Sequence, residues 1–143
     1  MAKLNNVWNY LGSTLDNFKA VLLGYRTYKA FISQVDANPP TITVVENTLG
    51  INISFEYGGE GSYYGVLDKA LFNDITTTVS GQKVQVVITP SSSNLVDNTM
   101  LFNVFPVFFD VIQVKSSNGG GLPTDNNLGV GYAAILEITV YNN

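Results

Sequence analysis

Apolar side chains near the N-terminus recur at a spacing that alternates between four and three residues. The residues in this stripe are Leu4, Trp8, Leu11, Leu15, Phe18 and Leu22. A repeat of about 3.5 residues keeps one side of a helix turned toward partner helices over several turns. Gly24 follows the stripe, and glycine commonly ends helices because it adopts the left-handed conformation without strain. The pattern predicts an α-helical oligomerisation stem over residues 1–24, in which copies of the chain associate through the stripe.

Two other interpretations of this segment stay open. The stripe could pack on the sheet of its own chain instead of on other copies. The helix could also kink at Gly12, because a glycine costs about 1 kcal/mol in a helix interior. Ser13 and Asp16 resemble the capping pair that starts a helix, which would give two short helices.

From residue 25 onward, apolar residues alternate with polar ones, which is the period of half-buried strands. The last segment of the chain, for example, places Ala134, Leu136, Ile138 and Val140 on one face. Strands are expected at residues 25–34, 41–45, 51–57, 62–67, 83–89, 99–109 and 132–141. Residues 111–115 either continue the 99–109 strand or begin a new one, which gives seven or eight strands. Short strands separated by Gly and Pro turns indicate a mostly β head over residues 25–143, an antiparallel β-sandwich of jelly-roll-like form.

Local signals refine this head. The glycine-rich connection 58–61 predicts a hairpin between two strands, one of which places Ile51, Ile53, Phe55 and Tyr57 on the same face. Pro106 predicts an edge strand or a bulge, because proline cannot donate to a sheet. The apolar residues around it are expected to form sandwich core or a contact between subunits. They are Leu101, Phe102, Phe105, Phe108 and Phe109.

Composition and charge exclude several classes of protein. Only 13% of residues are charged, against roughly 25% in ordinary globular proteins. Since interface cores are poor in charge, the deficit agrees with surface buried between subunits. The net charge is −4, and no cluster joins Arg26 with the six scattered lysines. Nucleic acid is therefore not an expected partner, because phosphates need clustered cations. The first segment matches neither a signal peptide nor a membrane span.

The inventory of reactive residues predicts a protein that is not an enzyme. Histidine and cysteine are absent, which removes Ser-His-Asp triads, thiol nucleophiles and ordinary zinc sites. No phosphate-binding glycine loop or EF-hand is present. Glu56 and Glu60 flank the predicted hairpin turn and could form a glycosidase pair, but an exposed strand residue and a turn residue explain them more simply. We expect no catalytic residue, cofactor or metal.

Tyr63 and Tyr64 are candidate ligand contacts. A tyrosine presents a flat apolar ring with a polar tip, which suits stacking on a sugar or on another protein surface. Consecutive residues of one strand point to opposite faces, so at most one of the two can belong to the core. An ordinary pair of cross-strand aromatic residues is the alternative interpretation.

Six short segments in the head form a set with a characteristic order. They are Tyr28–Gln34 (YKAFISQ), Pro39-Pro40, Val45–Gly50 (VENTLG), Gly61–Gly65 (GSYYG), Gly121–Asp125 (GLPTD) and Leu136–Asn142 (LEITVYN). In this order they resemble the motifs of a group of tailed-phage virion proteins, including those of crAss-like phages of gut bacteria. The resemblance covers residues 25–143, although residues 71–109 depart from it, and the N-terminal stripe lies outside it.

The resemblance implies a structural protein of the virion, assembled in the host cytoplasm, and carries over no catalytic residue. A head fibre or capsid-decoration subunit is the first expectation, and a tail or baseplate component is the second. The subunit is expected to form a homo-oligomer, a trimer by analogy with fibres, and to contact other virion proteins. The rival expectation is a carbohydrate-binding adhesion module for host glycans, with Tyr63 and Tyr64 as its aromatic platform.

Overall fold

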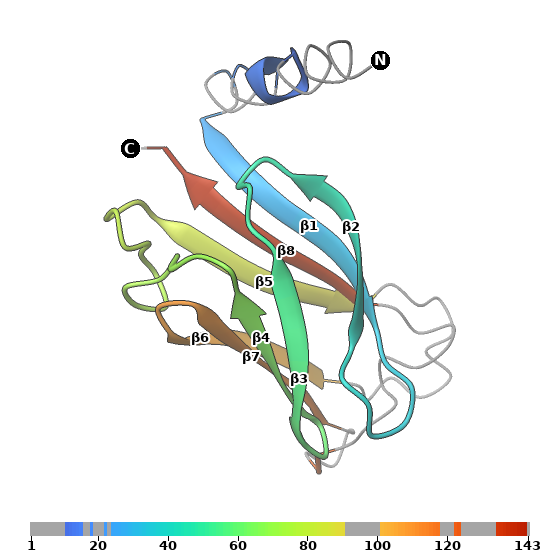
Figure 1. Ribbon diagram of the computed structural model, residues 1–143. Coiled ribbons are helices and arrows are strands. Elements are labelled where there is room, and N and C mark those ends of the chain that lie inside the picture. The colour runs from blue at the N-terminus through green and yellow to red at the C-terminus, as the bar shows by residue number, and fades with distance from the viewer. Residues whose placement is uncertain are drawn as a thin grey trace.

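The computed structural model describes residues 11–15, 18, 22, 24–90, 101–117, 122–123 and 134–142. These residues contain eight strands in two four-stranded antiparallel sheets (Figure 1). The strands are β1 (Tyr25–Ser33), β2 (Thr41–Asn47), β3 (Ile53–Gly59), β4 (Ser62–Leu67), β5 (Val84–Pro90), β6 (Leu101–Phe108), β7 (Val111–Ser117) and β8 (Ala134–Tyr141). Each observed strand begins and ends within two residues of its expected bounds.

The two sheets form a β-sandwich, as the alternating pattern predicted. Sheet A has the order β2-β1-β8-β5, and sheet B has the order β3-β4-β7-β6. Three of the strand pairs, β1–β2, β3–β4 and β6–β7, join strands that follow one another in the chain. The jelly-roll-like connections expected from the sequence are replaced by these local hairpins, so sandwich is the description that the strand order supports.

Alternation decides which side chains enter the core. On β8, Ala134, Leu136 and Ile138 are buried, whereas Ile135 and Glu137 between them are only partly buried. β4 alternates in the same way, with Tyr63, Gly65 and Leu67 buried. Since a strand turns successive side chains to opposite faces, the sequence pattern translates directly into one inner and one outer face for each sheet.

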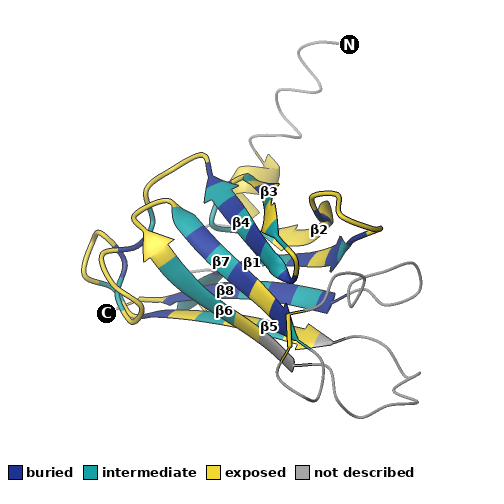
Figure 2. Ribbon diagram, turned by 90° about the horizontal axis from the view of Figure 1, so that it is seen from below, coloured by how far each residue is buried: buried dark blue, intermediate teal, exposed yellow. Residues whose placement is uncertain are grey.

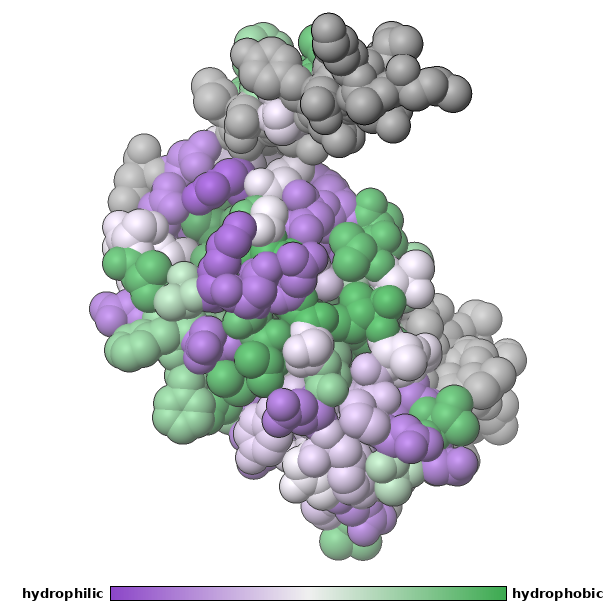
Figure 3. All heavy atoms as spheres, in the orientation of Figure 1, coloured by the Kyte–Doolittle hydropathy of each residue, from purple (hydrophilic) through white to green (hydrophobic). Residues whose placement is uncertain are grey.

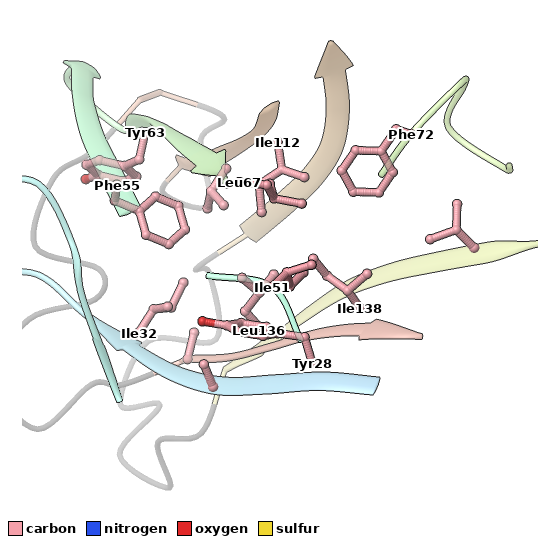
Figure 4. Close-up of a cluster of buried hydrophobic side chains, with 14 of the residues drawn as sticks. Tyr28, Ile32, Ile51, Phe55, Tyr63, Leu67, Phe72, Ile112, Leu136 and Ile138 are labelled. Carbon is pink, nitrogen blue, oxygen red and sulfur yellow. The ribbon is translucent and has the colours of Figure 1, made fainter. Parts of the chain in front are cut away.

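The core lies between the two sheets (Figure 4). Tyr28 and Ile32 come from β1 of sheet A, while Phe55 and Ile112 come from sheet B. Gly65 of β4 leaves room for this packing. A Cβ atom at that position would lie 2.9 Å from Cγ1 of Ile112 and 3.0 Å from Cε1 of Phe55. A glycine is therefore required where these two side chains approach the strand.

The connection between β4 and β5 carries the chain from sheet B to sheet A. The backbone N–H groups of Leu71 and Phe72 donate to the carbonyl oxygen of Phe109, at 2.7 and 2.8 Å. At its other end, the N–H of Val84 donates to the carbonyl oxygen of Thr76 at 3.1 Å. The Phe72 side chain is 1% exposed. The connection is thus tied to the β6–β7 turn by backbone hydrogen bonds and to the core by one aromatic ring.

The expectation for Pro106 is confirmed on both counts. β6 is an edge strand of sheet B, and its register with β7 shifts between Pro106 and Phe108. Phe108 is 67% exposed and Phe109 is 60% exposed, so neither belongs to the sandwich core. The other half of the expectation, a contact between subunits, stays a prediction at these two positions. Phe108 is the last residue of this edge strand, and Phe109 lies in the turn between β6 and β7. Phe105 is half-buried, with Nζ of Lys115 5.5 Å from its ring centre.

The N-terminal segment is described in part. Residues 11–15, 18 and 22 are helical and exposed (Figure 2). Leu4 and Trp8 lie outside the described residues, so the structure describes only part of the expected stem. Gly12 stands inside the described helical residues. Among the residues that the structure describes, no helix has the length and apolar character needed to cross a membrane.

Both ends of the head leave the sandwich at the same side (Figure 1). β1 and β8 are antiparallel neighbours, with Tyr25 opposite Tyr141. The N–H of Asn142 donates to the carbonyl oxygen of Gly24 at 2.8 Å. The helix therefore joins the head next to the end of β8. The β6–β7 turn and the β4–β5 connection lie at this end too.

Candidate functional site

The described part of the stripe lies free on the surface of the chain. Leu11 is 44% exposed, Leu15 and Phe18 are each 61% exposed, and Leu22 is 69% exposed. At these four positions the stripe is not packed on the sandwich of its own chain, which was the alternative interpretation. Association between copies stays a prediction, since the structure holds a single chain.

A second apolar surface lies at the end of the sandwich from which the helix leaves. It consists of Ile75, Val107, Phe108 and Phe109, which are 60, 38, 67 and 60% exposed. These residues surround a shallow hollow of about 180 Å³, the tip hollow, together with Phe72, Asn73, Asp74 and Pro106. Apolar side chains gather on the left side of Figure 3, where the β4–β5 connection and the β6–β7 turn lie in Figure 1.

A carboxylate at the tip hollow belongs to a tight turn. Oδ1 of Asp74 accepts hydrogen bonds from the N–H of Thr76 at 2.7 Å and from its hydroxyl at 2.9 Å. The Thr77 hydroxyl and these Thr76 groups lower the pKa of Asp74 to about 2. Hydrogen bonds to the charged form favour it, so Asp74 stays ionised and shapes the turn.

The structure separates the two tyrosines that the sequence suggested as ligand contacts. Tyr63 is fully buried in the core, so its ring is not available to a ligand. Tyr64 is half-buried and points to the outer face of sheet B. The prediction that only one of the two belongs to the core is thereby confirmed, and the aromatic platform is reduced to a single ring.

Polar groups surround Tyr64 on the outer face of sheet B. Nε2 of Gln113 donates to the Tyr64 hydroxyl at 3.2 Å and to Oγ of Ser62 at 2.9 Å. A hollow of about 380 Å³ lies beside this group. It is lined by Glu60, Gly61, Ser62, Asn103, Gln113, Lys115, Ser116, Ser117 and Pro123.

The carboxylates considered for catalysis occupy ordinary surface positions. Glu56 is an exposed residue of β3 that lies opposite Tyr64, and Glu60 is exposed in the turn between β3 and β4. Among the described residues, no group of three or more carboxylates, histidines or cysteines could hold a metal ion. The absence of catalysis remains an expectation from the sequence.

The outer face of sheet A carries three successive rows of side chains. Across β1 and β8, Tyr25 lies opposite Tyr141 and Thr27 lies opposite Thr139. In the third row, Lys29 lies between Glu137 of β8 and Glu46 of β2. Small threonines between a row of tyrosines and a row of long charged side chains leave a depression in the middle. This depression, the sheet A hollow, measures about 370 Å³, and these seven residues line it.

The contacts around the sheet A hollow orient its side chains. The two tyrosine rings lie 6.3 Å apart between centres, tilted by 58°. Nζ of Lys29 lies 3.4 Å from Oε2 of Glu137, and the Thr139 hydroxyl donates to Oε1 of the same carboxylate at 3.2 Å. Thr27 is only 6% exposed, yet its hydroxyl has no hydrogen-bond partner in the described part of the chain.

Sequence reasoning missed the sheet A hollow because its parts come from both ends of the head. Residues 25–29 and 137–141 are neighbours only through the pairing of β1 with β8. The available signal was the outward half of each alternating pattern, which reads tyrosine, threonine and a charged residue along β1 and the reverse order along its antiparallel neighbour β8.

Comparison with protein-family models, with curated protein sequences and with solved structures finds no match to this chain. Function therefore has to be inferred from the residues and from the geometry that brings them together.

Proposed function

We propose that this chain is a structural subunit of a tailed-phage virion, a head fibre or capsid-decoration protein, which self-assembles through its N-terminal helix. The observation that carries the proposal is the exposed stripe, in which Leu11, Leu15, Phe18 and Leu22 have no cover from their own head. The setting in a virion, after assembly in the host cytoplasm, rests on the set of motifs that the head shares with tailed-phage virion proteins.

Physical chemistry favours other copies of the same stripe as its cover. A heptad-like spacing is self-complementary, because each apolar side chain fits between those of an identical helix. Burying one Leu or Phe contributes roughly 1.5–3 kcal/mol. Four such residues on each copy supply enough apolar surface for a small bundle. In this proposal, three copies associate, residues 1–24 form the stem, and residues 25–143 form the projecting heads that contact other virion proteins.

Analytical ultracentrifugation of the full chain tests the proposal. Wild-type protein should sediment as an oligomer at micromolar concentration. Leu15→Asp should weaken association by roughly thirtyfold or more, since losing one buried Leu costs roughly 2–5 kcal/mol. Ser13→Asp, also in the helix but off the stripe, is the matched control and should leave the oligomer intact.

A wild-type chain that sediments as a monomer would contradict the proposal. An oligomer that survives Leu15→Asp and Phe18→Asp would place the interface in the head instead. In that case the tip hollow, with Phe108 and Phe109 exposed beside it, is the surface to change next.

A tail or baseplate component is the alternative position within a virion. It shares the same stem and head, and cryo-electron microscopy of the particle distinguishes it by where the subunit lies. The carbohydrate-binding alternative loses Tyr63 as a contact because the core buries that ring. Tyr64 is then the one tyrosine of the predicted platform that lies outside the core.

A further inference from the structure

We infer that the sheet A hollow binds a neutral saccharide, with one pyranose ring seated over the two threonines. The site lies on the outer face of β1 and β8 and is separate from both the stripe and the tip hollow. All of its residues belong to a single subunit. Its volume of about 370 Å³ falls within the roughly 300–1,000 Å³ of small-molecule sites.

The tyrosine row supplies the apolar contact that a pyranose ring needs. Tyr141 is 40% exposed, and its hydroxyl donates to Oε1 of Gln85 at 2.9 Å, which holds the side chain on the sheet. Tyr25 meets it at a tilt of 58°, so the two rings form an angled wall instead of one flat stack. A tyrosine offers both an apolar face and a polar tip to such a ligand.

The charged row supplies donors and acceptors in alternation. Glu46, Lys29 and Glu137 follow one another across β2, β1 and β8. The side chains of Lys29 and Glu137 are each 40% exposed, so their polar atoms remain accessible despite the 3.4 Å contact between them. A sugar hydroxyl both donates and accepts, and it can therefore bridge an ammonium group and a carboxylate.

The Thr27 hydroxyl is an independent observation that favours a ligand at the floor of the hollow. Its hydroxyl is buried at the floor of the hollow and has no partner in the described part of the chain. A buried polar group without a hydrogen bond costs stability, so native proteins seldom keep one without a reason. The Thr139 hydroxyl opposite it already donates to Glu137. The Thr27 hydroxyl is itself closed to solvent, so in this inference the side chain turns about its Cα–Cβ bond to meet a ligand hydroxyl placed over the floor.

Charge argues for a neutral ligand. An anion would meet two carboxylates for one ammonium group, and like charges in contact repel. A metal cation would meet Lys29 in the same row, and the described residues hold no group of three metal-ligating side chains. A polyhydroxylated ring needs no compensating charge and uses every polar group of the hollow.

Ligand-observed saturation-transfer NMR on the full chain tests the inference. The probes are the methyl pyranosides of glucose, galactose and mannose, and N-acetylglucosamine, each added alone. At least one should receive magnetisation from the wild-type protein. Tyr141→Ala and Thr27→Val should each weaken its binding by about tenfold, the change expected when one good contact to a bound ligand is lost.

Thr27→Val separates binding from a structural role, because it replaces the hydroxyl with a methyl group of similar size. With no partner to lose, the variant should melt at the wild-type temperature or higher, while its affinity for the sugar falls. Tyr64→Ala, on the outer face of sheet B, is the matched control and should bind as wild type does.

Three results would overturn the inference. The first is that none of the four sugars binds the wild-type chain. The second is that Thr27→Val binds as tightly as wild type or melts at a lower temperature, which would make the hydroxyl structural. The third is that Tyr64→Ala loses binding while Tyr141→Ala keeps it, which would move the site to sheet B.

Discussion

The hydroxyl of Tyr63 donates a hydrogen bond of 2.8 Å to Oε1 of Gln34, inside the sandwich. Tyr63 belongs to sheet B, and Gln34 directly follows β1 of sheet A. Nε2 of Gln34 in turn donates to the backbone carbonyl oxygens of Asp36 and Asn38. One buried polar chain thus links a strand of one sheet to the turn that leads from β1 to β2.

Tyr63→Phe should lower the free energy of unfolding by about 1 kcal/mol, the typical net contribution of one hydrogen bond. Both partners are almost completely buried, so water cannot replace the lost hydroxyl. Denaturation in urea measures the change. Tyr64→Phe on the outer face should cost less, and an equal loss from the two variants would speak against the buried link.

Phe72→Ala should destabilise the head by about 3–5 kcal/mol, as expected for an aromatic ring removed from a core. Phe109→Ala, at 60% exposure, should change the free energy of unfolding by less than about 0.5 kcal/mol. The same urea titration compares the two. A large loss of unfolding free energy in Phe109→Ala would mean that the Phe109 ring stabilises the fold, instead of being an exposed side chain available for a contact.

Gly65→Ala should destabilise the sandwich by about 1–3 kcal/mol, because overpacking forces neighbouring side chains from their positions. The added methyl group would meet Ile112 and Phe55 within 3.0 Å. Gly12→Ala is a useful control, since nothing lies within 4 Å of its Cβ position and alanine favours a helix. Thermal unfolding followed by circular dichroism should show a loss for Gly65→Ala only.

Stability should fall as the solution is acidified below pH 4. The pKa of Asp74 is lowered from 3.8 to about 2 by hydrogen bonds from Thr77 and Thr76. A carboxyl whose pKa is lower in the folded state binds fewer protons there than in the unfolded chain. Its contribution is therefore complete above 3.8 and is lost as the pH falls toward 2.

Asp74→Asn checks this assignment. Between pH 4 and pH 2, the melting temperature of the variant should depend less on pH than that of wild type. Above pH 5, the melting temperatures of the two proteins should vary with pH in the same way. Parallel curves across the whole range would mean that other carboxyls control the acid transition. Asp68 is one, because hydrogen bonds from Asn52 lower its pKa as well.

The strands could be predicted closely because burial in a sandwich follows the period of the chain. On β8 the four expected inward residues, Ala134, Leu136, Ile138 and Val140, are all buried. Pro106 and the 58–61 connection carried equally direct local signals. The sequence left open whether Phe108 and Phe109 belong to the core or to a contact between subunits, because hydrophobicity favours burial without identifying the surface that provides it.

The sheet A hollow could not be predicted for a different reason. Its floor depends on Thr27 meeting Thr139, and the register between strands so far apart in the chain has no local signature. The unpartnered Thr27 hydroxyl is visible only once the neighbouring side chains are in place. A sequence pattern predicts which face of a strand each residue occupies. It does not predict which strand pairs with which, and the hollow depends on that pairing.

The hydrogen bond from Asn142 to Gly24 has a practical consequence for anyone who labels this protein. A fluorescent or affinity tag fused after β8 would sit against the base of the helix and could crowd its neighbours. The 35–39 turn lies at the opposite pole of the head, where an inserted epitope would stay clear of that junction. A comparison of the two tagged proteins therefore separates a disturbance of contacts made by the helix from a disturbance of the loops at the opposite end.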